Sequence, residues 1–163
     1  MNKMNDNKHL GLLIAVLLLF VCSNIWACSC IGKVSVKKAI KESDVVFMGK
    51  VLSKEKVIVP QKLPGIETTI YHRYYKFTFT IECKYKGKIK TDTVEIITGV
   101  GDGDCGYNFE IGKNYVVYSN WKKKYFREGS KVSKFLYTDI CTRTTELVKK
   151  EDTEIKKHKK LCK

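Results

Sequence analysis

The number and placement of the cysteines restrict the possible folds of this chain more than any other feature of its sequence. One of the seven cysteines, Cys22, lies in an apolar N-terminal block. The other six follow that block: Cys28, Cys30, Cys83, Cys105, Cys141 and Cys162. An even number of cysteines in an exported chain favours a disulfide framework, although sequence alone does not choose among the possible pairings. A structural zinc site is not expected, because the sequence has no C-x-x-C pair and few histidines.

The first 27 residues have the pattern of a secretory signal peptide. Lys3 and Lys8 lie in a polar start, an apolar block runs over residues 10–22, and a short stretch leads to Ala27. The block has 13 residues, whereas a helix that spans a bilayer needs roughly 20, so a retained membrane anchor is the weaker interpretation. Cleavage after Ala27 would leave one domain of 136 residues, 28–163, which we expect in the periplasm or outside the cell.

The junction between Ala27 and Cys28 leaves a second interpretation open. A bacterial lipoprotein signal places a small residue directly before a cysteine, and residues 25–28 approach that pattern, although Trp26 is an unusual occupant. Acylation of Cys28 would anchor the chain to the cell envelope and would block its α-amine. Contact with a membrane is expected only in that case.

The chain is strongly basic, with a formal net charge of +14. Residues 1–27 contain two Lys and one Asp, so their removal leaves +13 on the mature domain. This excess predicts attraction to polyanions on cell surfaces, such as anionic glycans, in preference to nucleic acid. A basic loop with interleaved aromatic residues is predicted over 121–131, and its candidate polyanion-binding residues are Lys122, Lys123, Lys124 and Arg127. The alternative is a solvated hairpin loop whose aromatic residues pack back on the domain.

The hydrophobic pattern predicts a mainly β domain with a helix near each end. The first helix is expected over 34–40 and ends near Ser43. Five strands are expected at 44–59, 71–83, 93–98, 115–118 and 134–137, with a bulge at Gly49 and loops at 60–65, 84–90 and 99–106. Residues 145–162 are predicted to form a helix in which Val148, Ile155 and Cys162 share one face. Five strands joined by turns favour a small closed barrel or a sandwich.

Several segments of the mature domain match the pattern of a known family. They are CSC at residues 28–30, SDVVFMGKV, YYKFTFTIECKYKG, CGYNFEIGKNYVVYSN and LYTDICTRT. From Cys28 to about Thr144, the chain resembles the N-terminal, netrin-like domain of the tissue inhibitors of metalloproteinases. The resemblance implies a disulfide-stabilised, five-stranded barrel of the oligonucleotide/oligosaccharide-binding (OB) type with flanking helices. It also implies the bridges Cys28–Cys105 and Cys30–Cys141. The predicted position of Cys162 on the buried face of the last helix indicates a third bridge, Cys83–Cys162, which the resemblance does not supply.

The resemblance further implies a function for the segment Cys28, Ser29 and Cys30. In the inhibitors, the α-amine and carbonyl oxygen of the first cysteine chelate the zinc of the target protease, and the second residue points into the pocket beside it. This chain is therefore expected to inhibit a zinc metalloendopeptidase, with no cofactor and no catalysis of its own, since no catalytic motif is present. The alternative is a netrin-like binding module that inhibits nothing, or a lipid-anchored envelope protein that binds anionic surfaces. Asp102 and Asp104 are expected in a glycine-rich turn and not in a calcium loop.

Overall fold

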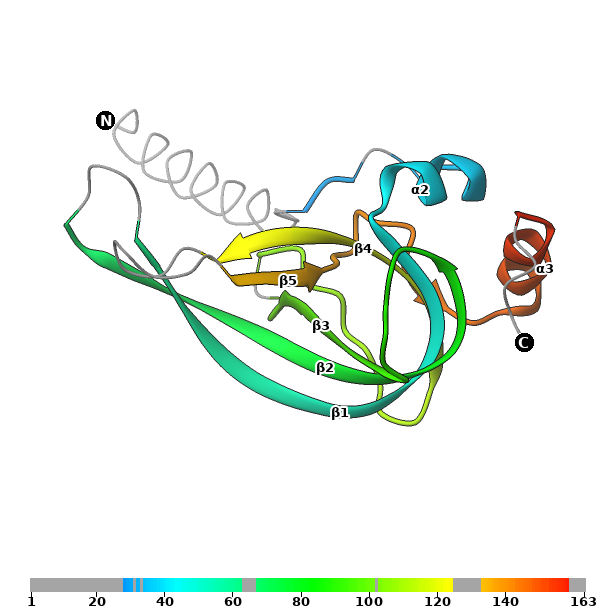
Figure 1. Ribbon diagram of the computed structural model, residues 1–163. Coiled ribbons are helices and arrows are strands. Elements are labelled where there is room, and N and C mark those ends of the chain that lie inside the picture. Colours follow the sequence, from blue (N-terminus) through cyan, green and yellow to red (C-terminus); the bar gives the residue numbers. More distant parts are fainter. Residues whose placement is uncertain are drawn as a thin grey trace, which may run out of the picture.

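The computed structural model describes residues 28–30, 32, 34–62, 67–101, 103–124 and 133–158. The predicted signal peptide, the arginine of the basic loop, Arg127, and Cys162 lie outside these residues. The elements are α2 (Val36–Glu42), β1 (Val45–Lys62), β2 (Thr69–Lys86), β3 (Thr93–Gly99), β4 (Asn114–Lys124), β5 (Ser133–Tyr137), β6 (Thr145–Glu146) and α3 (Lys149–His158), as Figure 1 shows. Within the described part of the chain, no helix has the length and apolar character to cross a membrane.

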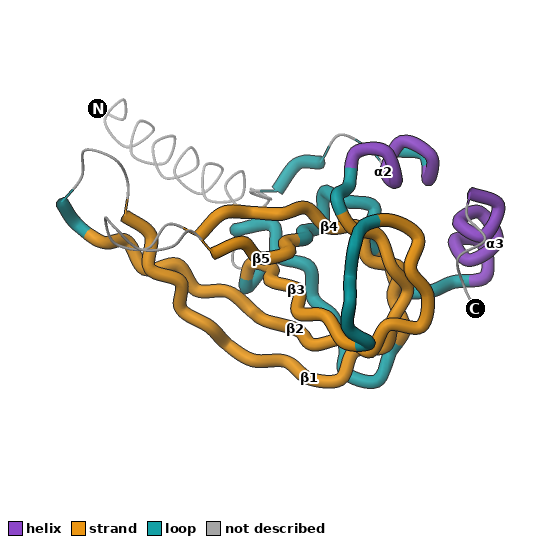
Figure 2. The backbone as a smooth tube through the Cα atoms, viewed as in Figure 1, coloured by secondary structure: helices purple, strands orange, loops and turns teal. Residues whose placement is uncertain are grey.

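One sheet contains all six described strands, in the order β1-β2-β3-β5-β4-β6. Strand β1 also pairs with β4, so the pairing returns to its first strand and five strands form a ring, with the two-residue β6 added to β4. Strands dominate the trace in Figure 2, and α2 and α3 lie at the end of the molecule opposite the tip of the β1–β2 hairpin. The prediction of a mainly β chain with disulfides, with one helix before the first strand and one after the last, is therefore confirmed.

Strands β3 and β5 run parallel, whereas the other pairs in the described sheet are antiparallel. Parallel strands end at the same edge of a sheet. The segment that begins at Val100, after β3, therefore leaves the sheet beside the segment after β5, residues 138–144. A hydrogen bond joins them, because the N–H of Ile140 donates to the carbonyl oxygen of Cys105 at 3.0 Å. The fold thus brings together two loops that are distant in the sequence.

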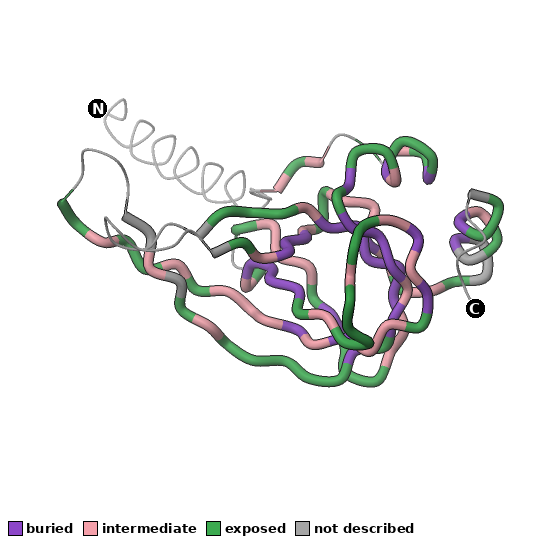
Figure 3. Tube along the Cα trace, in the orientation of Figure 1, coloured by how far each residue is buried: buried purple, intermediate pink, exposed green. Residues whose placement is uncertain are grey.

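The alternation of side chains along the strands produces two apolar clusters. In β4, Tyr115 and Val117 point into the ring, where they pack with the aromatic cluster around Phe109. The intervening residues, Val116 and Tyr118, belong to a second cluster that α2 and α3 cover. Buried residues are concentrated in the ring and below the helices, whereas the far part of the β1–β2 hairpin is intermediate or exposed (Figure 3). Apolar side chains therefore pack against both faces of the sheet that carries the loops.

The first two strands are longer than the sequence predicts. Residues 60–65 are predicted as a loop, but β1 continues to Lys62, and Pro60 is paired with Tyr71 of β2. Strand β4 pairs with β1 only over Val45–Lys50, so the distal part of β1 pairs with β2 alone among the described strands. A proline is tolerated in such a strand because its missing N–H removes no bond from a second neighbour.

Two predictions near the C-terminal half are also wrong in part. Residues 121–124 belong to β4 and pair with β5, so the predicted basic loop begins later than Trp121. The C-terminal helix begins at Lys149 and not at residue 145, because Thr145 and Glu146 extend the edge of β4 as β6. Ile155 is buried as predicted, whereas Val148 precedes the helix and is exposed.

The bulge predicted at Gly49 is present, since the pairing of β1 with β2 shifts register between Met48 and Gly49. A Cβ at position 49 would overlap the carbonyl oxygen of Thr80. We therefore expect Gly49→Ala to lower the free energy of unfolding by about 1–3 kcal/mol, as measured by chemical denaturation. The control Lys56→Ala, on the exposed part of β1, should change it by no more than about 0.5 kcal/mol. Equal stability of the two variants would contradict the close approach of β1 and β2.

Candidate functional site

Two disulfides tie residues 28–30 to the two loops that follow β3 and β5. Cys28 is bridged to Cys105 and Cys30 to Cys141, with Cα–Cα distances of 5.5 and 5.1 Å. These are the pairings that the resemblance implied. Ser29 lies between the two bridged residues and is exposed. The bridges indicate that the chain works in an extracellular or otherwise oxidising compartment.

The third predicted bridge has one end in the described residues. Cys83 is buried in β2 and is itself disulfide-bonded. Its predicted partner, Cys162, lies outside the described residues. The Cys83–Cys162 pairing therefore stays a prediction.

The bridges span long stretches of sequence, 77 and 111 residues. In the chain-entropy model, closing loops of this length stabilises the folded state by about 4–5 kcal/mol each. A chain end normally frays because few contacts hold it. Here, covalent links at two positions flank one exposed residue, so the backbone around Ser29 is fixed relative to both loops.

The loop that receives Cys28 is organised by the carboxylate of Asp104. Its oxygens accept hydrogen bonds from the backbone N–H groups of Val100 and Gly101, both at 2.8 Å, and of Gly106 at 3.1 Å. Partial burial favours the neutral carboxyl group, but the backbone donors together outweigh it and hold the pKa of Asp104 below its usual value. Cys105 has a φ of 58°, a left-handed conformation that is uncommon for a residue with a side chain. The carboxylate thus fixes a tight turn around the bridged cysteine.

This loop is the glycine-rich turn that the sequence predicts. The oxygens of Asp104 are engaged by the backbone, and Asp102 lies outside the described residues. Among the residues that the structure describes, no group of three His, Cys, Asp or Glu side chains is placed to hold a metal ion.

The loop that receives Cys30 is fixed by a second acidic side chain and by hydroxyl groups. Oδ1 of Asp139 accepts hydrogen bonds from the N–H groups of Cys141 and Thr142, both at 3.0 Å. The hydroxyl groups of Thr138, Thr142 and Thr144 lie 2.7–3.0 Å apart. Both loops are therefore held by local hydrogen bonds in addition to the bridges.

Arg143 connects the chain after Cys30 to the C-terminal helix. Its Nη1 donates to the carbonyl oxygen of Val34 at 2.6 Å, and its Nε and Nη2 donate to the carboxylate of Glu151 at 2.9 and 2.6 Å. The hydroxyl group of Tyr118 donates to the same carboxylate at 3.0 Å. Burial and the neighbouring Glu151 raise the pKa of Tyr118 above its usual value, so the phenol keeps its proton. One guanidinium thus joins the N-terminal segment, the second loop and α3.

Apolar residues stand near this edge of the sheet. Because Gly99 is paired with Tyr74, the β1–β2 hairpin beyond Tyr74 extends past the edge from which the two loops leave. Burial, and secondarily the charge of Asp104, raises the pKa of Tyr74, which agrees with a position beside the first loop. Ile58 and Tyr71 on the hairpin are 62% and 69% exposed, and Ile140 in the second loop is 45% exposed. These side chains offer apolar contact area near the edge from which the two loops leave.

Three of the predicted polyanion-binding residues, Lys122, Lys123 and Lys124, lie in β4 and not in a loop. Lys122 and Lys123 point to opposite faces because they are neighbours in β4. The Nζ of Lys122 lies 3.2 Å from the ring centroid of Tyr137, and burial lowers the pKa of this lysine. For Lys124, only the backbone position in β4 is described, and Arg127 lies outside the described residues. The binding of a polyanion by these residues stays a prediction.

No protein-family model matches the chain, and a search of curated proteins finds no match.

The role of Asp104 predicts a pH-dependent effect of its removal. We expect Asp104→Ala to reduce the free energy of unfolding at pH 7 by about 1–2 kcal/mol, because three backbone donors lose a charged acceptor. The pKa of Asp104 is lowered in the folded state. The stability that its carboxylate contributes is therefore complete when the pH is above the usual pKa of 3.8, and it is lost as the pH falls through the lower pKa of the folded state. Denaturation curves at several pH values measure it, with Glu82→Ala as the control for loss of an exposed carboxylate. A difference that grows on acidification would refute this role.

The ion pair of Arg143 and Glu151 predicts non-additive substitutions. The two side chains are only 13% and 7% exposed, so Arg143→Met leaves the buried charge of Glu151 without its partner and should cost about 3–5 kcal/mol. Glu151→Met should cost less, because Arg143 keeps an ion pair with Glu154 at 3.4 Å. The double variant should cost less than the sum of the single variants, because neither charge is then left alone. Unfolding free energies of the four proteins measure the coupling. Additive and small effects would rule out the pair as an anchor of the N-terminal segment.

Proposed function

We propose that the chain is an exported inhibitor of zinc metalloendopeptidases that uses Cys28 as its zinc-binding residue. The observation that carries the proposal is the pair of bridges on either side of the exposed Ser29. In the proposal, export removes residues 1–27, and the five-stranded ring is an OB-type barrel that serves as the scaffold. The zinc belongs to the target, and the chain itself performs no catalysis and needs no cofactor.

The chemistry of the proposal depends on two atoms of one residue. The α-amine nitrogen and the carbonyl oxygen of Cys28 would form a five-membered chelate ring with the metal. Catalytic zinc sites keep an open position that takes nitrogen or oxygen ligands, which is the position of the attacking water. An α-amine has a pKa of about 7.7–8.0 and must lose its proton to bind, a loss that the metal favours. Inhibition should therefore weaken as the pH falls below neutrality.

The rigidity of the segment supports this function. A flexible terminus would lose conformational freedom on binding, whereas the backbone at Cys28 and Cys30 is already held by two loops. Ser29, the exposed residue between them, is then the side chain that enters the pocket beside the zinc. The apolar side chains of the hairpin and of Ile140 would enlarge the contact with the protease.

A lipid-anchored or purely cell-surface-binding module is the competing function. The junction of Ala27 with Cys28 and the mature charge of +13 favour it. Acylation would occupy the nitrogen that the zinc requires, so a lipid anchor and inhibition exclude each other. The state of the Cys28 amine therefore distinguishes inhibition from the lipid-anchored form.

The test compares two forms of the oxidised protein, one that begins at Cys28 and one that retains Ala27. Each is titrated against the catalytic domains of several families of zinc metalloendopeptidase. The form that begins at Cys28 should inhibit at least one of them, and the form with Ala27 should be weaker by about 100-fold or more, because its amine at residue 28 is an amide. Circular dichroism and disulfide mapping establish that both forms have the same fold.

Lys56→Ala is the matched control, because it removes a charge from the exposed part of β1 and should leave inhibition unchanged. Equal inhibition by the two N-terminal forms would exclude chelation by the amine. A correctly bridged, unmodified protein that inhibits no member of the panel would also contradict the proposal.

A further inference from the structure

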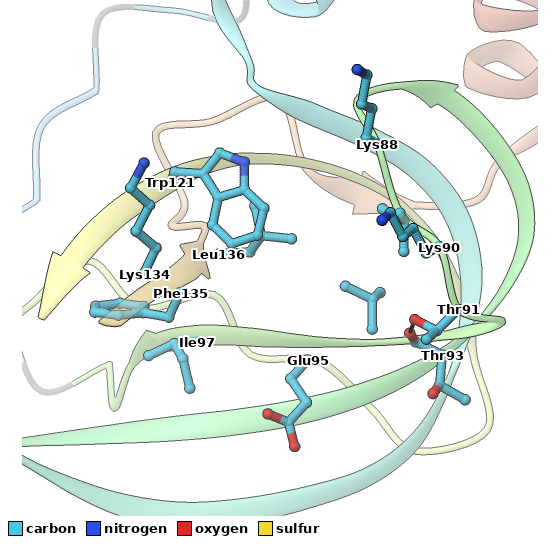
Figure 4. A pocket seen from close by; sticks show the side chains of 12 residues that line it. Lys88, Lys90, Thr91, Thr93, Glu95, Ile97, Trp121, Lys134, Phe135 and Leu136 are labelled. Carbon is cyan, nitrogen blue, oxygen red and sulfur yellow. Dashed lines mark hydrogen bonds between the residues drawn. The ribbon is translucent and has the colours of Figure 1, made fainter. Parts of the chain in front are cut away.

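The seam between β3 and β5 opens at the end opposite the bridged segment. The two strands pair only at Ile96–Leu136 and Ile97–Tyr137, and the residues before these pairs diverge. A cavity of about 390 Å³ occupies the gap, between the start of β3, the start of β5, Trp121 of β4 and the loop over residues 88–91 (Figure 4). Its volume lies in the range of sites for small molecules.

The wall of the cavity is mostly apolar. The apolar residues that line it are Ile89, Val94, Ile97, Trp121, Phe135 and Leu136. Leu136 belongs to the core inside the ring, with Val94 packed against it, so the cavity reaches the edge of that core. Trp121 is 47% exposed, which is unusual for so large an apolar side chain and leaves ring surface available to a ligand. A ligand with an aromatic ring system fits these surroundings.

The charged residues of the cavity give it a positive potential. Lys88, Lys90 and Lys134 line it and are exposed, and none of the three forms an ion pair with another described residue. The one carboxylate of the lining, that of Glu95, is paired with Lys76 at 3.3 Å, and Figure 4 shows it pointing away from Trp121 and Lys90. A ligand with a negative group is therefore favoured over a neutral or cationic one.

The loop that forms one side of the cavity is held in place by the protein itself. The Nζ of Lys84 donates to the carbonyl oxygens of Ile89 and Thr91 at 3.0 and 3.3 Å. The hydroxyl group of Thr91 donates to the carbonyl oxygen of Thr93 at 2.6 Å. Because these bonds order the loop before any ligand binds, little conformational entropy is lost on binding.

We propose that this cavity binds a small aromatic anion. The ring system of the ligand packs on Trp121 and the apolar wall, and its carboxylate or sulfonate is held by Lys90 or by Lys134, which lie on opposite sides of the cavity (Figure 4). The site lies at the opposite end of the seam from Cys28, so it does not depend on the proposed inhibition of a protease.

The test uses the oxidised protein of residues 28–163, in which Trp121 is the only tryptophan, since the other of the two is Trp26. Naphthalene-2-carboxylate and its neutral analogue naphthalene-2-carboxamide are titrated by calorimetry and by nitrogen–proton correlation spectra that follow the indole N–H. The carboxylate should bind with a dissociation constant of about 1 mM or lower and should shift the indole resonance. The carboxamide should bind at least about tenfold more weakly, and added salt should weaken binding of the carboxylate.

Substitutions separate this cavity from the rest of the basic surface. Trp121→Ala and the double variant Lys90→Ala/Lys134→Ala should each reduce the affinity for the carboxylate about tenfold or more. Lys50→Ala/Lys56→Ala, which removes two exposed lysines from β1, should leave it unchanged. The proposal is overturned if the carboxamide binds as tightly as the carboxylate, or if the indole resonance does not move at saturation. It is also overturned if the two double variants lose equal affinity, or if the carboxylate does not bind at 5 mM, about five times the expected dissociation constant.

Discussion

Two residue pairs, Ile96–Leu136 and Ile97–Tyr137, join β3 to β5 and complete the ring of strands. Because this pairing is parallel, the loops that follow both strands leave the sheet at one edge, and they carry the cysteines that receive residues 28 and 30. An antiparallel pairing would have placed these loops at opposite edges, about the length of a strand apart. The position of the N-terminal segment therefore depends on the direction of one short pair of strands.

The two ends of the seam have different physical character. At the carboxyl ends of the strands, backbone N–H groups, Asp104, Asp139 and the bridges produce a rigid surface around an exposed Ser29. At the amino ends, the strands separate and leave an apolar cavity whose lysines form no ion pair with another described residue. The first end is suited to presenting the chain to a partner, and the second to enclosing a small ligand. Both follow from a pairing that is only two residues long.

Much of the fold follows from local patterns, and most of the site does not. Short-range signals predicted α2, the bulge at Gly49 and the glycine-rich turn, because each depends on residues close in the sequence. The bridges to Cys105 and Cys141 came from the motif resemblance, since sequence spacing leaves the pairings open. The contacts of Arg143 and the cavity at Trp121 were missed, because they join segments that only the ring brings together. The start of the last helix was misplaced because helical periodicity does not reveal that Thr145 and Glu146 pair with β4 as β6.

The central claim is that a bridged, unmodified Cys28 is the first residue of the mature chain. The intact mass of the exported protein, measured before and after reduction, tests it most directly. The account predicts the mass of residues 28–163 without an added group, and a gain of six hydrogens on reduction of three bridges. A mass that includes acyl chains or residues 1–27 would contradict it, because neither form has a free amine at Cys28.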